Sequence, residues 1–215
     1  MNKGIFVTGI GTEVGKTVIS AILTEALEAD YWKPIQSGDL DFTDTMKVQS
    51  WISNSKTKFH PEAYRLNTPM SPHAAAAIDG VEIDLSQINL AVTANFLLAE
   101  GAGGLLVPLN YKDCIIDLIQ HLQLPVILIS KHYLGSINHT LLSIEALRNR
   151  NIPIGGLIFN GEEHPTTEAI IQEMSGIQAL CRINPLENIT KEKIAEEAKR
   201  IKGKVLQLKF SEGDS

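Results

Sequence analysis

The sequence predicts an α/β fold in which helices cover both faces of a mostly parallel sheet. Two observations predict it. Short, continuously apolar runs recur along the chain, and stretches with apolar residues at helical spacing separate them. Continuous apolar runs are typical of strands that are buried on both faces. The length of 215 residues predicts one domain over 1–215, with 211–215 as a frayed tail.

The first half of the chain alternates strand and helix and then becomes irregular. The first strand is an Ile-Phe-Val-Thr run, and the helix after it carries apolar residues every three or four positions. Pro34 ends the second strand, and Pro61, Pro69 and Pro72 favour an irregular covering segment. The expected elements are a strand at 5–8, a helix at 17–28, a strand at 30–33, a helix at 42–53 and an irregular segment at 56–79.

The second half repeats the alternation. Asp84 is a suitable N-cap for a helix that runs to residue 95. A strand at 96–99 runs into a glycine-rich stretch. The further expected elements are an extended piece at 105–109, helices at 114–122, 138–150, 166–174 and 190–201, and strands at 125–129 and 154–159.

Composition and charge exclude several classes of protein. Nineteen Lys and Arg against 25 Asp and Glu give a net charge of −6, which argues against binding to nucleic acid or to anionic membranes. We find neither an apolar run long enough for a membrane span nor a signal-peptide pattern. Cys114 and Cys181 lack metal-binding spacing and indicate free thiols in a reducing cytoplasm.

The clearest motif is a phosphate loop directly after the first strand, reading Gly-Ile-Gly-Thr-Glu-Val-Gly-Lys-Thr. Its glycines let successive backbone amides point at an anion, and the following helix adds its positive end. Lys16 supplies a full charge for the outer phosphates, and the Thr17 hydroxyl is placed to bind Mg²⁺. The loop is a variant, because the glycine expected at Ile10 stands one residue earlier, at Gly9. It predicts a P-loop NTPase-like fold.

Charged residues follow two other predicted strands, at the edge where open α/β sheets bind ligands. Lys33 follows the second strand and can oppose developing negative charge. Glu100 follows the third and is placed to bind Mg²⁺ directly or through other groups. One of Asp39, Asp41 and Asp44 could complete a metal site.

Together these stretches resemble the dethiobiotin synthetase family, and the resemblance covers about residues 1–186 in order. The matching motifs are Thr-Gly-x-x-Thr-x-Val-Gly-Lys-Thr at 8–17, Lys-Pro-x-x-Ser-Gly at 33–38, Ser-Pro-His at 71–73, Glu-Gly-Ala-Gly-Gly at 100–104 and Leu-Gly-x-Ile-Asn-His at 134–139. Two places depart from the family. Gly11 stands where members often carry Asp, and 183–186 only approximates the family's Ile-Pro-x-Leu adenine loop.

The resemblance implies an ATP-dependent ring closure in biotin biosynthesis. The diamine 7,8-diaminopelargonate takes up CO₂ on one amine to give a carbamate. The carbamate oxygen takes the γ-phosphoryl group of ATP to form a carbamic-phosphoric anhydride, and the second amine then closes the cyclic urea. ATP is therefore the implied co-substrate, Mg²⁺ the implied cofactor and the cytoplasm the implied compartment.

The resemblance also implies roles position by position. Lys16 and Lys33 are the implied catalytic residues, and the implied Mg²⁺ ligands are Thr17, Asp44 and Glu100. Asp44 is chosen because it opens a helix as in the family. The implied residues at the diamine or carbamate are Thr12, Glu13 and Ser37. The implied ATP contacts are Glu13, Val14, Gly15, Lys16, Thr17, Val18, Asp44, Glu100, Gly101, Ala102, Gly103, Asn160, Gly161, Asn184, Pro185 and Leu186.

The resemblance further implies a homodimer whose diamine site is completed across the subunit interface. The stretch Gly135, Ser136, Ile137 and Asn138 precedes a predicted helix, so its amides could hold the far carboxylate of the diamine. A plain turn capped by Ser136 or Asn138 is the alternative.

Two other classes of protein fit the sequence less well. A partner-switching ATPase of the cell-division and plasmid-partition type shares the expected sheet, but its signature lysine would stand at Gly11. A small-molecule kinase predicts an arginine-rich lid, and the arginines here form no such cluster. Structural roles are expected for His73 and His139, because amine attack on CO₂ needs no nucleophile from the enzyme.

Overall fold

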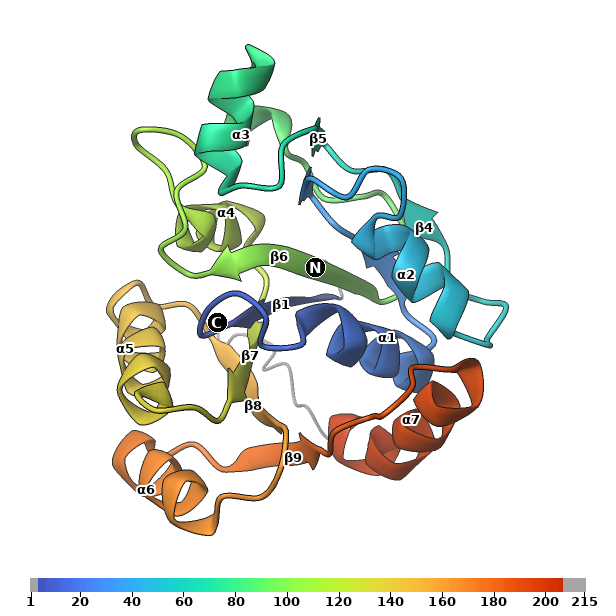
Figure 1. Ribbon diagram of the computed structural model, residues 1–215, viewed down its shortest axis with the longest axis vertical. Helices are drawn as coiled ribbons and strands as arrows, with labels where there is room; N and C mark the ends of the chain where they lie inside the picture. Colours follow the sequence, from blue (N-terminus) through green and yellow to red (C-terminus); the bar gives the residue numbers. More distant parts are fainter. Residues whose placement is uncertain (1–3, 207–215) are drawn as a thin grey trace.

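The computed structural model describes residues 4–206 and is built on a seven-stranded sheet (Figure 1). The pairings between neighbouring strands are parallel, and the strand order is β4-β2-β6-β1-β7-β8-β9. The predicted fold class is therefore confirmed. The strands are β1 (Gly4–Gly9), β2 (Asp30–Trp32), β4 (Phe59–His60), β6 (Leu97–Gly104), β7 (Val126–Lys131), β8 (Ile154–Asn160) and β9 (Ala179–Ile183).

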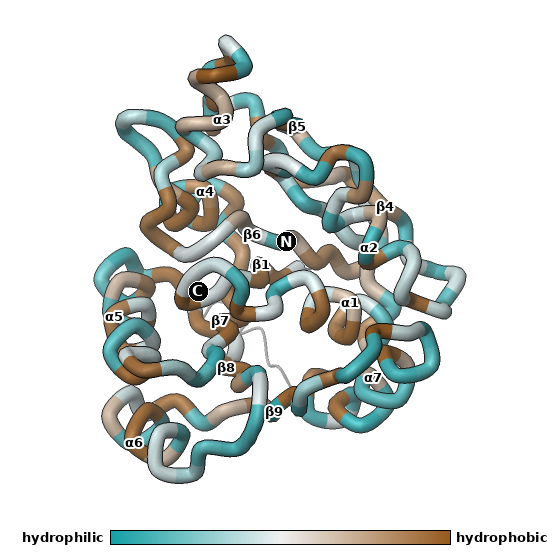
Figure 2. The backbone as a smooth tube through the Cα atoms, viewed as in Figure 1, coloured by the Kyte–Doolittle hydropathy of each residue, from teal (hydrophilic) through white to brown (hydrophobic). Residues whose placement is uncertain are grey.

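Helices cover both faces of this sheet because successive strand residues point to opposite sides. Ile5 and Val7 face the cluster that contains α1 and α7, whereas Phe6 faces the one that contains α4 and α5. Apolar segments accordingly gather in the central strands (Figure 2). One layer consists of α1 (Lys16–Leu27), α2 (Asp44–Trp51) and α7 (Lys191–Val205), and the other of α4 (Ile115–Leu122), α5 (Ser136–Asn149) and α6 (Pro165–Ser175).

A smaller unit lies beyond the β4 side of the sheet, where Figure 1 shows it at the top. It pairs β3 (Ile35–Ser37) with β5 (Tyr64–Leu66) in parallel and carries α3 (Pro72–Asp79). Its loops approach the carboxyl ends of β2 and β6 and form one wall of the cavity described below.

Most expected elements are confirmed, with both ends within two residues except that the strand expected at 96–99 continues to Gly104 and the helix expected at 190–201 continues to Val205. These are the strands expected at 5–8, 30–33, 96–99, 125–129 and 154–159 and the helices expected at 17–28, 42–53, 114–122, 138–150, 166–174 and 190–201. The helix expected from 138 begins at Ser136, so the stretch 136–138 is its first turn. The predicted frayed tail at 211–215 lies outside the described residues. Within 4–206, no helix is both long and apolar enough to span a bilayer.

Three expectations are wrong. The helix expected at 84–95 is a 3-10 turn over Leu85–Gln87, which Asp84 caps by accepting the Ser86 N–H at 2.9 Å. The segment after that turn has no continuous apolar face, since Ile88 is buried and Val92 is fully exposed.

The other two errors concern extended and irregular segments. Residues 105–109 form a turn rather than a strand, because the Val107 N–H bonds back to the Gly104 carbonyl and only Pro108 makes a β-bridge, to Cys114. The segment 56–79 is not irregular throughout, since it contains β4, β5 and α3. Pro72 does not prevent α3, because it stands at the start of the helix, where a missing N–H costs nothing. The strands β3 and β9 were not expected.

A buried carboxylate fixes the amino-terminal end of β2. Asp30 accepts hydrogen bonds from the Lys58 N–H at 3.0 Å, the Thr93 hydroxyl at 2.6 Å and the Asn95 amide at 3.0 Å, and His60 lies 3.1 Å away. Burial alone would raise the pKa of Asp30, but these hydrogen bonds outweigh burial and hold the pKa below its usual range. The carboxylate thereby joins three segments of chain.

We predict that Asp30→Asn lowers the free energy of unfolding at pH 7 by about 2–3 kcal/mol, because the new amide group would face donors. The folded pKa of Asp30 lies below the unfolded value of about 3.9, so its stabilisation is present above that pH and is lost as pH falls through the folded pKa. Urea unfolding from pH 7 down to pH 3 should show the difference shrinking. The exposed Asp41→Asn is the control, and an equal loss in both variants would contradict the assignment.

Candidate active site

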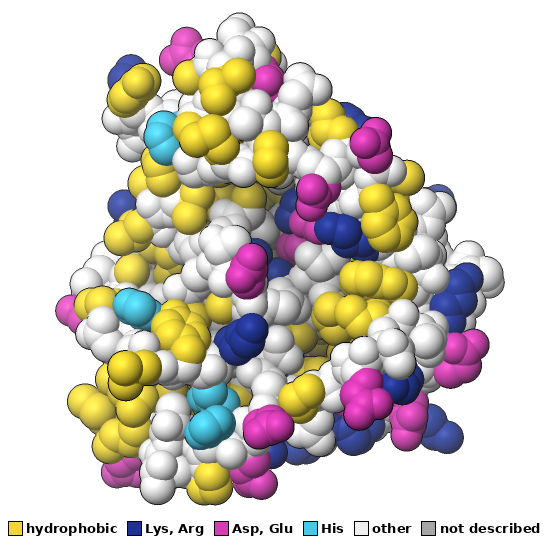
Figure 3. Space-filling view, viewed as in Figure 1, with side chains coloured by type: hydrophobic (Ala, Val, Ile, Leu, Met, Phe, Trp, Pro, Cys, Tyr) yellow, Lys and Arg dark blue, Asp and Glu magenta, His cyan; other side chains and the backbone are white. Residues whose placement is uncertain are grey.

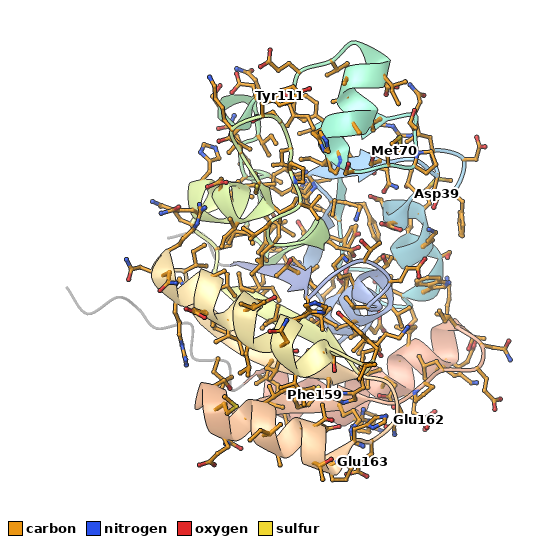
Figure 4. The ribbon with its side chains drawn as sticks, turned by 60° about the vertical axis from the view of Figure 1, so that its left-hand side comes forward. Asp39, Met70, Tyr111, Phe159, Glu162 and Glu163 are labelled. Atoms are coloured by element: carbon orange, nitrogen blue, oxygen red, sulfur yellow. The ribbon has the colours of Figure 1, made fainter. Side chains whose placement is uncertain are left out.

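A cavity of about 900 Å³ opens where the phosphate loop, the carboxyl ends of β2 and β6, and the loops before α2 and α3 meet. Figure 3 shows this face, hollowed at its centre, with basic and acidic side chains in the hollow. Asp39 and Met70, labelled in Figure 4, come from the two loops and lie at the same rim. The predicted residues that line the cavity are Thr12, Glu13, Gly15, Lys16, Thr17, Val18, Lys33, Ser37, Asp44, Glu100, Ala102 and Gly103.

Two glycines give the phosphate loop its course. Gly15 has φ of 87°, in the left-handed region, and a Cβ there would collide with the Asn160 amide. A Cβ on Gly9 would collide with the Val14 side chain. Close packing against Val14 therefore requires a glycine at position 9, one residue before the usual place in the motif. A Cβ on Gly11 would meet nothing within 4 Å, so this departure from the family leaves open space.

Lys16 folds back over the loop. Its Nζ donates to the Gly11 carbonyl at 3.0 Å, and the residue is only 8% exposed. Burial lowers the pKa of Lys16 to about 8, because desolvation outweighs the opposing effect of the Glu100 carboxylate. Nearby Lys33 lowers this pKa further. An anion in the cavity would therefore stabilise the charged form of Lys16.

Lys33 lies between two carboxylates. Its Nζ is 2.8 Å from Asp44 Oδ2 and 3.2 Å from Glu100 Oε1, and the Lys33 and Glu100 side chains are at most 4% exposed. Burial alone would lower the pKa of Lys33, but the two carboxylates outweigh burial and raise it. The same attraction overcomes burial at Asp44 and lowers the pKa of that carboxyl. The three groups therefore form a charged bridge in which Lys33 and Glu100 are buried and Asp44 is partly exposed.

Strand register creates this bridge. The pairing of Trp32 with Ala99 places the next residues, Lys33 and Glu100, beside each other at the carboxyl edge. Thr17 at the start of α1 donates its hydroxyl to Glu100 Oε1 at 2.9 Å. Asp44 opens α2, where its backbone N–H donates to the Gln36 side chain at 3.2 Å. The three predicted Mg²⁺ ligands therefore lie together.

Two residues that contact these carboxylates were not predicted from the sequence. Tyr31 donates its hydroxyl to Glu100 Oε2 at 3.0 Å. Lys47 donates to Asp44 Oδ1 at 3.1 Å and also lines the cavity. The spacing of Lys47, three residues after Asp44 on a predicted helix, was a usable signal. No sequence signal pointed to Tyr31, since its contact depends on strand register.

Other predicted residues lie away from the cavity lining. Asn160 donates to the Val14 carbonyl at 2.8 Å, so its side chain supports the phosphate loop. The Gly161 N–H bonds the Ile183 carbonyl at 2.9 Å and so connects the ends of β8 and β9. The residues outside the lining are Val14, Gly101, Asn160, Gly161, the start of α5 at 135–138, and 184–186.

Ser37 lines the cavity but already has hydrogen-bond partners. Its Oγ lies 3.1 Å from the Thr68 carbonyl and 2.8 Å from the Met70 carbonyl. Among residues 4–206, no cluster of three or more His, Cys, Asp and Glu is arranged as a metal site. The predicted Mg²⁺ ligands are two carboxylates and a hydroxyl. A set with only two Asp or Glu residues is not a cluster of that kind.

A phosphate loop at the carboxyl edge of a parallel sheet, with two lysines over one cavity, defines a P-loop nucleotide-binding protein. The family model described as "AAA domain" matches residues 3–193. At the level of fold, the septum site-determining protein MinD from Pyrococcus horikoshii superposes with a TM-score of 0.62 at 16% identity, over 97% of this chain and 93% of that chain. A ParA family ATPase from Chlorobium tepidum gives 0.57 at 12% identity, over 97% and 99%. At these identities the likeness shows the fold alone.

Sequence similarity is much higher to one group of enzymes. The protein named ATP-dependent dethiobiotin synthetase BioD of Christiangramia forsetii is 58% identical over 183 residues, which cover 85% of this chain and 88% of that protein. The protein of the same name from Cytophaga hutchinsonii is 48% identical over 200 residues, covering 93% and 97%. This chain belongs to the ATP-dependent dethiobiotin synthetase family.

We predict that Gly15→Ala abolishes measurable ATP binding, because the new methyl group would require a left-handed backbone and would displace Asn160. Gly11→Ala should bind ATP within about twofold of the wild type, since its methyl group meets open space. Isothermal titration with ATP and Mg²⁺ measures both. Equal losses in the two variants would contradict the geometry of the loop.

Proposed function

We propose that the protein closes the cyclic urea of dethiobiotin from 7,8-diaminopelargonate, CO₂ and ATP, as the names of its relatives suggest. One observation of the structure supports the proposal independently of those names. Lys33 and Lys16 reach the same cavity from the sheet and from the phosphate loop, as a reaction that gathers negative charge on two neighbouring groups requires.

In the proposed reaction, one amine of the diamine bonds to CO₂ and loses a proton, which gives a carbamate. A carbamate oxygen bonds to the γ-phosphorus of ATP, and the bond from that phosphorus to ADP breaks. The second amine then attacks the carbonyl carbon, phosphate leaves with the bonding electrons, and the nitrogen loses its proton. The product is a cyclic urea.

The lysines would stabilise the anionic groups of these steps. Lys16, beside the loop that cradles phosphates, would contact the outer phosphates of ATP. Lys33 would face the carbamate and the transferring phosphoryl group, while Asp44 and Glu100 keep it protonated. The smaller unit with α3 forms the opposite wall through Met70 and would limit hydrolysis of the anhydride by water.

The residues fit a magnesium ion. Asp44 and Glu100 offer hard carboxylate oxygens, and Thr17 offers a hydroxyl already directed at Glu100. Mg²⁺ held by these three residues would neutralise phosphate charge and orient the γ-phosphoryl group. Thr12 and Ser37, both in the lining, would contact the diamine or carbamate.

The adenine would lie near the ends of β8 and β9. Asn160 supports this proposal by its position against the phosphate loop, and the hydrogen bond from Gly161 to Ile183 brings the segment 184–186 beside it. An asparagine amide can both donate to and accept from adenine. The free thiols of Cys114 and Cys181 support a cytoplasmic setting.

The direct test supplies the protein with the diamine, ¹³C-bicarbonate, ATP and Mg²⁺. Mass spectrometry should detect dethiobiotin that carries one ¹³C atom, formed together with one ADP per product. ATP hydrolysis that is unaffected by the diamine and yields no cyclic urea would contradict the proposed function and would favour a partner-switching ATPase.

We predict that Lys16→Ala and Lys33→Ala each lower turnover about 10²–10³-fold, the usual cost of losing one preorganised electrostatic donor. The measurement is steady-state formation of dethiobiotin. The exposed Lys58→Ala serves as the control and should retain wild-type turnover. Near-normal turnover of a folded Lys33→Ala would exclude a catalytic role for Lys33.

We predict that Glu100→Gln raises the Mg²⁺ concentration for half-maximal activity about tenfold or more, while the KM for the diamine changes little. The amide keeps the size of the side chain but removes its anionic charge. Titration of Mg²⁺ against activity, at several concentrations of diamine, separates the two effects. An unchanged Mg²⁺ curve would mean that Glu100 serves the fold only.

We also propose a homodimer in which the start of α5 completes the partner's site. Exposed apolar side chains near this helix start support an interface there, since Leu134 is fully exposed and Tyr133 and Ile137 are partly exposed. Backbone amides at 135–138 would hold the diamine carboxylate, because one phosphate loop cannot bind both ends of a long apolar chain.

Mixed dimers test that arrangement. One subunit carries Lys16→Ala and the other Gly135→Val, which strains a position with φ of 103°. If sites are shared, one of the two composite sites stays intact and about half of wild-type activity returns. No recovery, or a fully active monomer by light scattering, would exclude a shared site.

A further inference from the structure

Tyr31 contacts the carboxylate that carries the proposed metal site. Its hydroxyl lies 3.0 Å from Glu100 Oε2, and both side chains are buried. The other oxygen of Glu100, Oε1, faces Thr17 at 2.9 Å and Lys33 at 3.2 Å. The two oxygens of the Glu100 carboxylate therefore have separate partners. Oε1 faces Thr17 and Lys33, which line the cavity, and Oε2 faces Tyr31, which does not.

The fold holds the tyrosine ring firmly in place. Tyr31 is the central residue of β2, pairs with Leu98 of β6 and packs its ring against Phe59, with 5.9 Å between the ring centres. A ring fixed at the strand can move its hydroxyl very little. The Tyr31 hydroxyl is therefore held where it donates to Glu100 Oε2.

We infer that Tyr31 is a positioning residue for the metal: it holds Glu100 Oε2 so that Oε1 is presented to the cation beside Thr17. The inference rests on the proposed role of Glu100 as a Mg²⁺ ligand. Without the phenol, Glu100 can rotate its carboxylate, and a buried anionic oxygen is left without its donor. Groups that orient metal ligands in this way commonly change metal affinity by about 10–100-fold.

A purely structural role for Tyr31 makes a different prediction. Its ring belongs to the core beside α1, so a structural role would be seen as lost stability and equal losses for every ligand. The positioning role instead predicts a selective loss of metal affinity in a folded protein. Tyr31→Phe keeps the ring and removes only the hydroxyl, so it separates the two roles.

The test measures Mn²⁺ binding by electron paramagnetic resonance in the presence of the non-hydrolysable ATP analogue AMP-PNP. Tyr31→Phe should bind Mn²⁺ about 10–100-fold more weakly than the wild type. The control is Tyr64→Phe, which also loses a hydrogen-bonded hydroxyl, at Asp84, and should bind Mn²⁺ normally. Unchanged Mn²⁺ affinity in a folded Tyr31→Phe would overturn the inference.

A double-mutant cycle shows whether Tyr31 acts through Glu100. In the Glu100→Gln background, Tyr31→Phe should cause less than about a twofold further loss of Mn²⁺ affinity. Equal fold-losses in both backgrounds would overturn the inference. The readout does not depend on the product of the reaction, so it can fail while dethiobiotin formation holds, and it can succeed where that reaction is absent.

A measurement on the wild type covers the case in which Tyr31→Phe does not fold. The chain has four tyrosines, so [¹³Cζ]tyrosine labelling gives four signals. Phe variants of Tyr64, Tyr111 and Tyr133 assign three of them, and the remaining signal belongs to Tyr31. Adding Mg²⁺ to the AMP-PNP complex should shift this signal, since Glu100 changes partners. A Tyr31 signal that Mg²⁺ leaves in place would overturn the inference.

Discussion

The buried ammonium of Lys33 between Asp44 and Glu100 is the interaction on which the rest of the site depends. Lys33 and Glu100 are buried and Asp44 is one-fifth exposed, and charges this far from water are stable only beside opposite charge. Loss of one partner of a buried ion pair commonly costs about 3–5 kcal/mol. The bridge requires β2 beside β6 in one register and α2 beginning at Asp44. The position of Lys33 in the cavity therefore depends on the order of the strands and on where α2 begins.

The two lysines of the cavity are held in opposite ways. Lys33 has two carboxylate partners, and its charge is fixed before any ligand arrives. Lys16 donates to the Gly11 carbonyl oxygen, and burial weakens the charged form of Lys16. Bound phosphates would therefore stabilise the Lys16 charge most. Lys33 therefore holds the two carboxylates together in the free protein, whereas the charge of Lys16 would be stabilised mainly by the bound nucleotide.

Much of this arrangement could be predicted from the sequence. Lys33 and Glu100 both follow apolar runs, and the carboxyl ends of parallel strands lie at one edge, so both residues were expected at that edge. That their strands are neighbours in this register was not predicted. The contact of Tyr31 with Glu100 could not be predicted, because it requires the pairing of Tyr31 with Leu98. The helix expected after Asp84 was wrong because Asp84 does cap a turn, but the residues that follow have no continuous apolar face.

The fold alone does not identify the enzyme, since MinD and ParA proteins share it. Sequence identity of 58% and 48% to dethiobiotin synthetases identifies the family.

The most direct test of the central claim is to measure the pKa values of both lysines in the nucleotide-free protein by ¹⁵Nζ and ¹³Cε NMR. We expect Lys16 to titrate at a pKa of about 8 and Lys33 to titrate at a pKa above the usual lysine value. In Glu100→Gln, the pKa of Lys33 should fall, since one of its two carboxylate partners is gone. A Lys33 that loses its proton at or below the pKa of Lys16 would contradict the charged bridge and the functional account that depends on it.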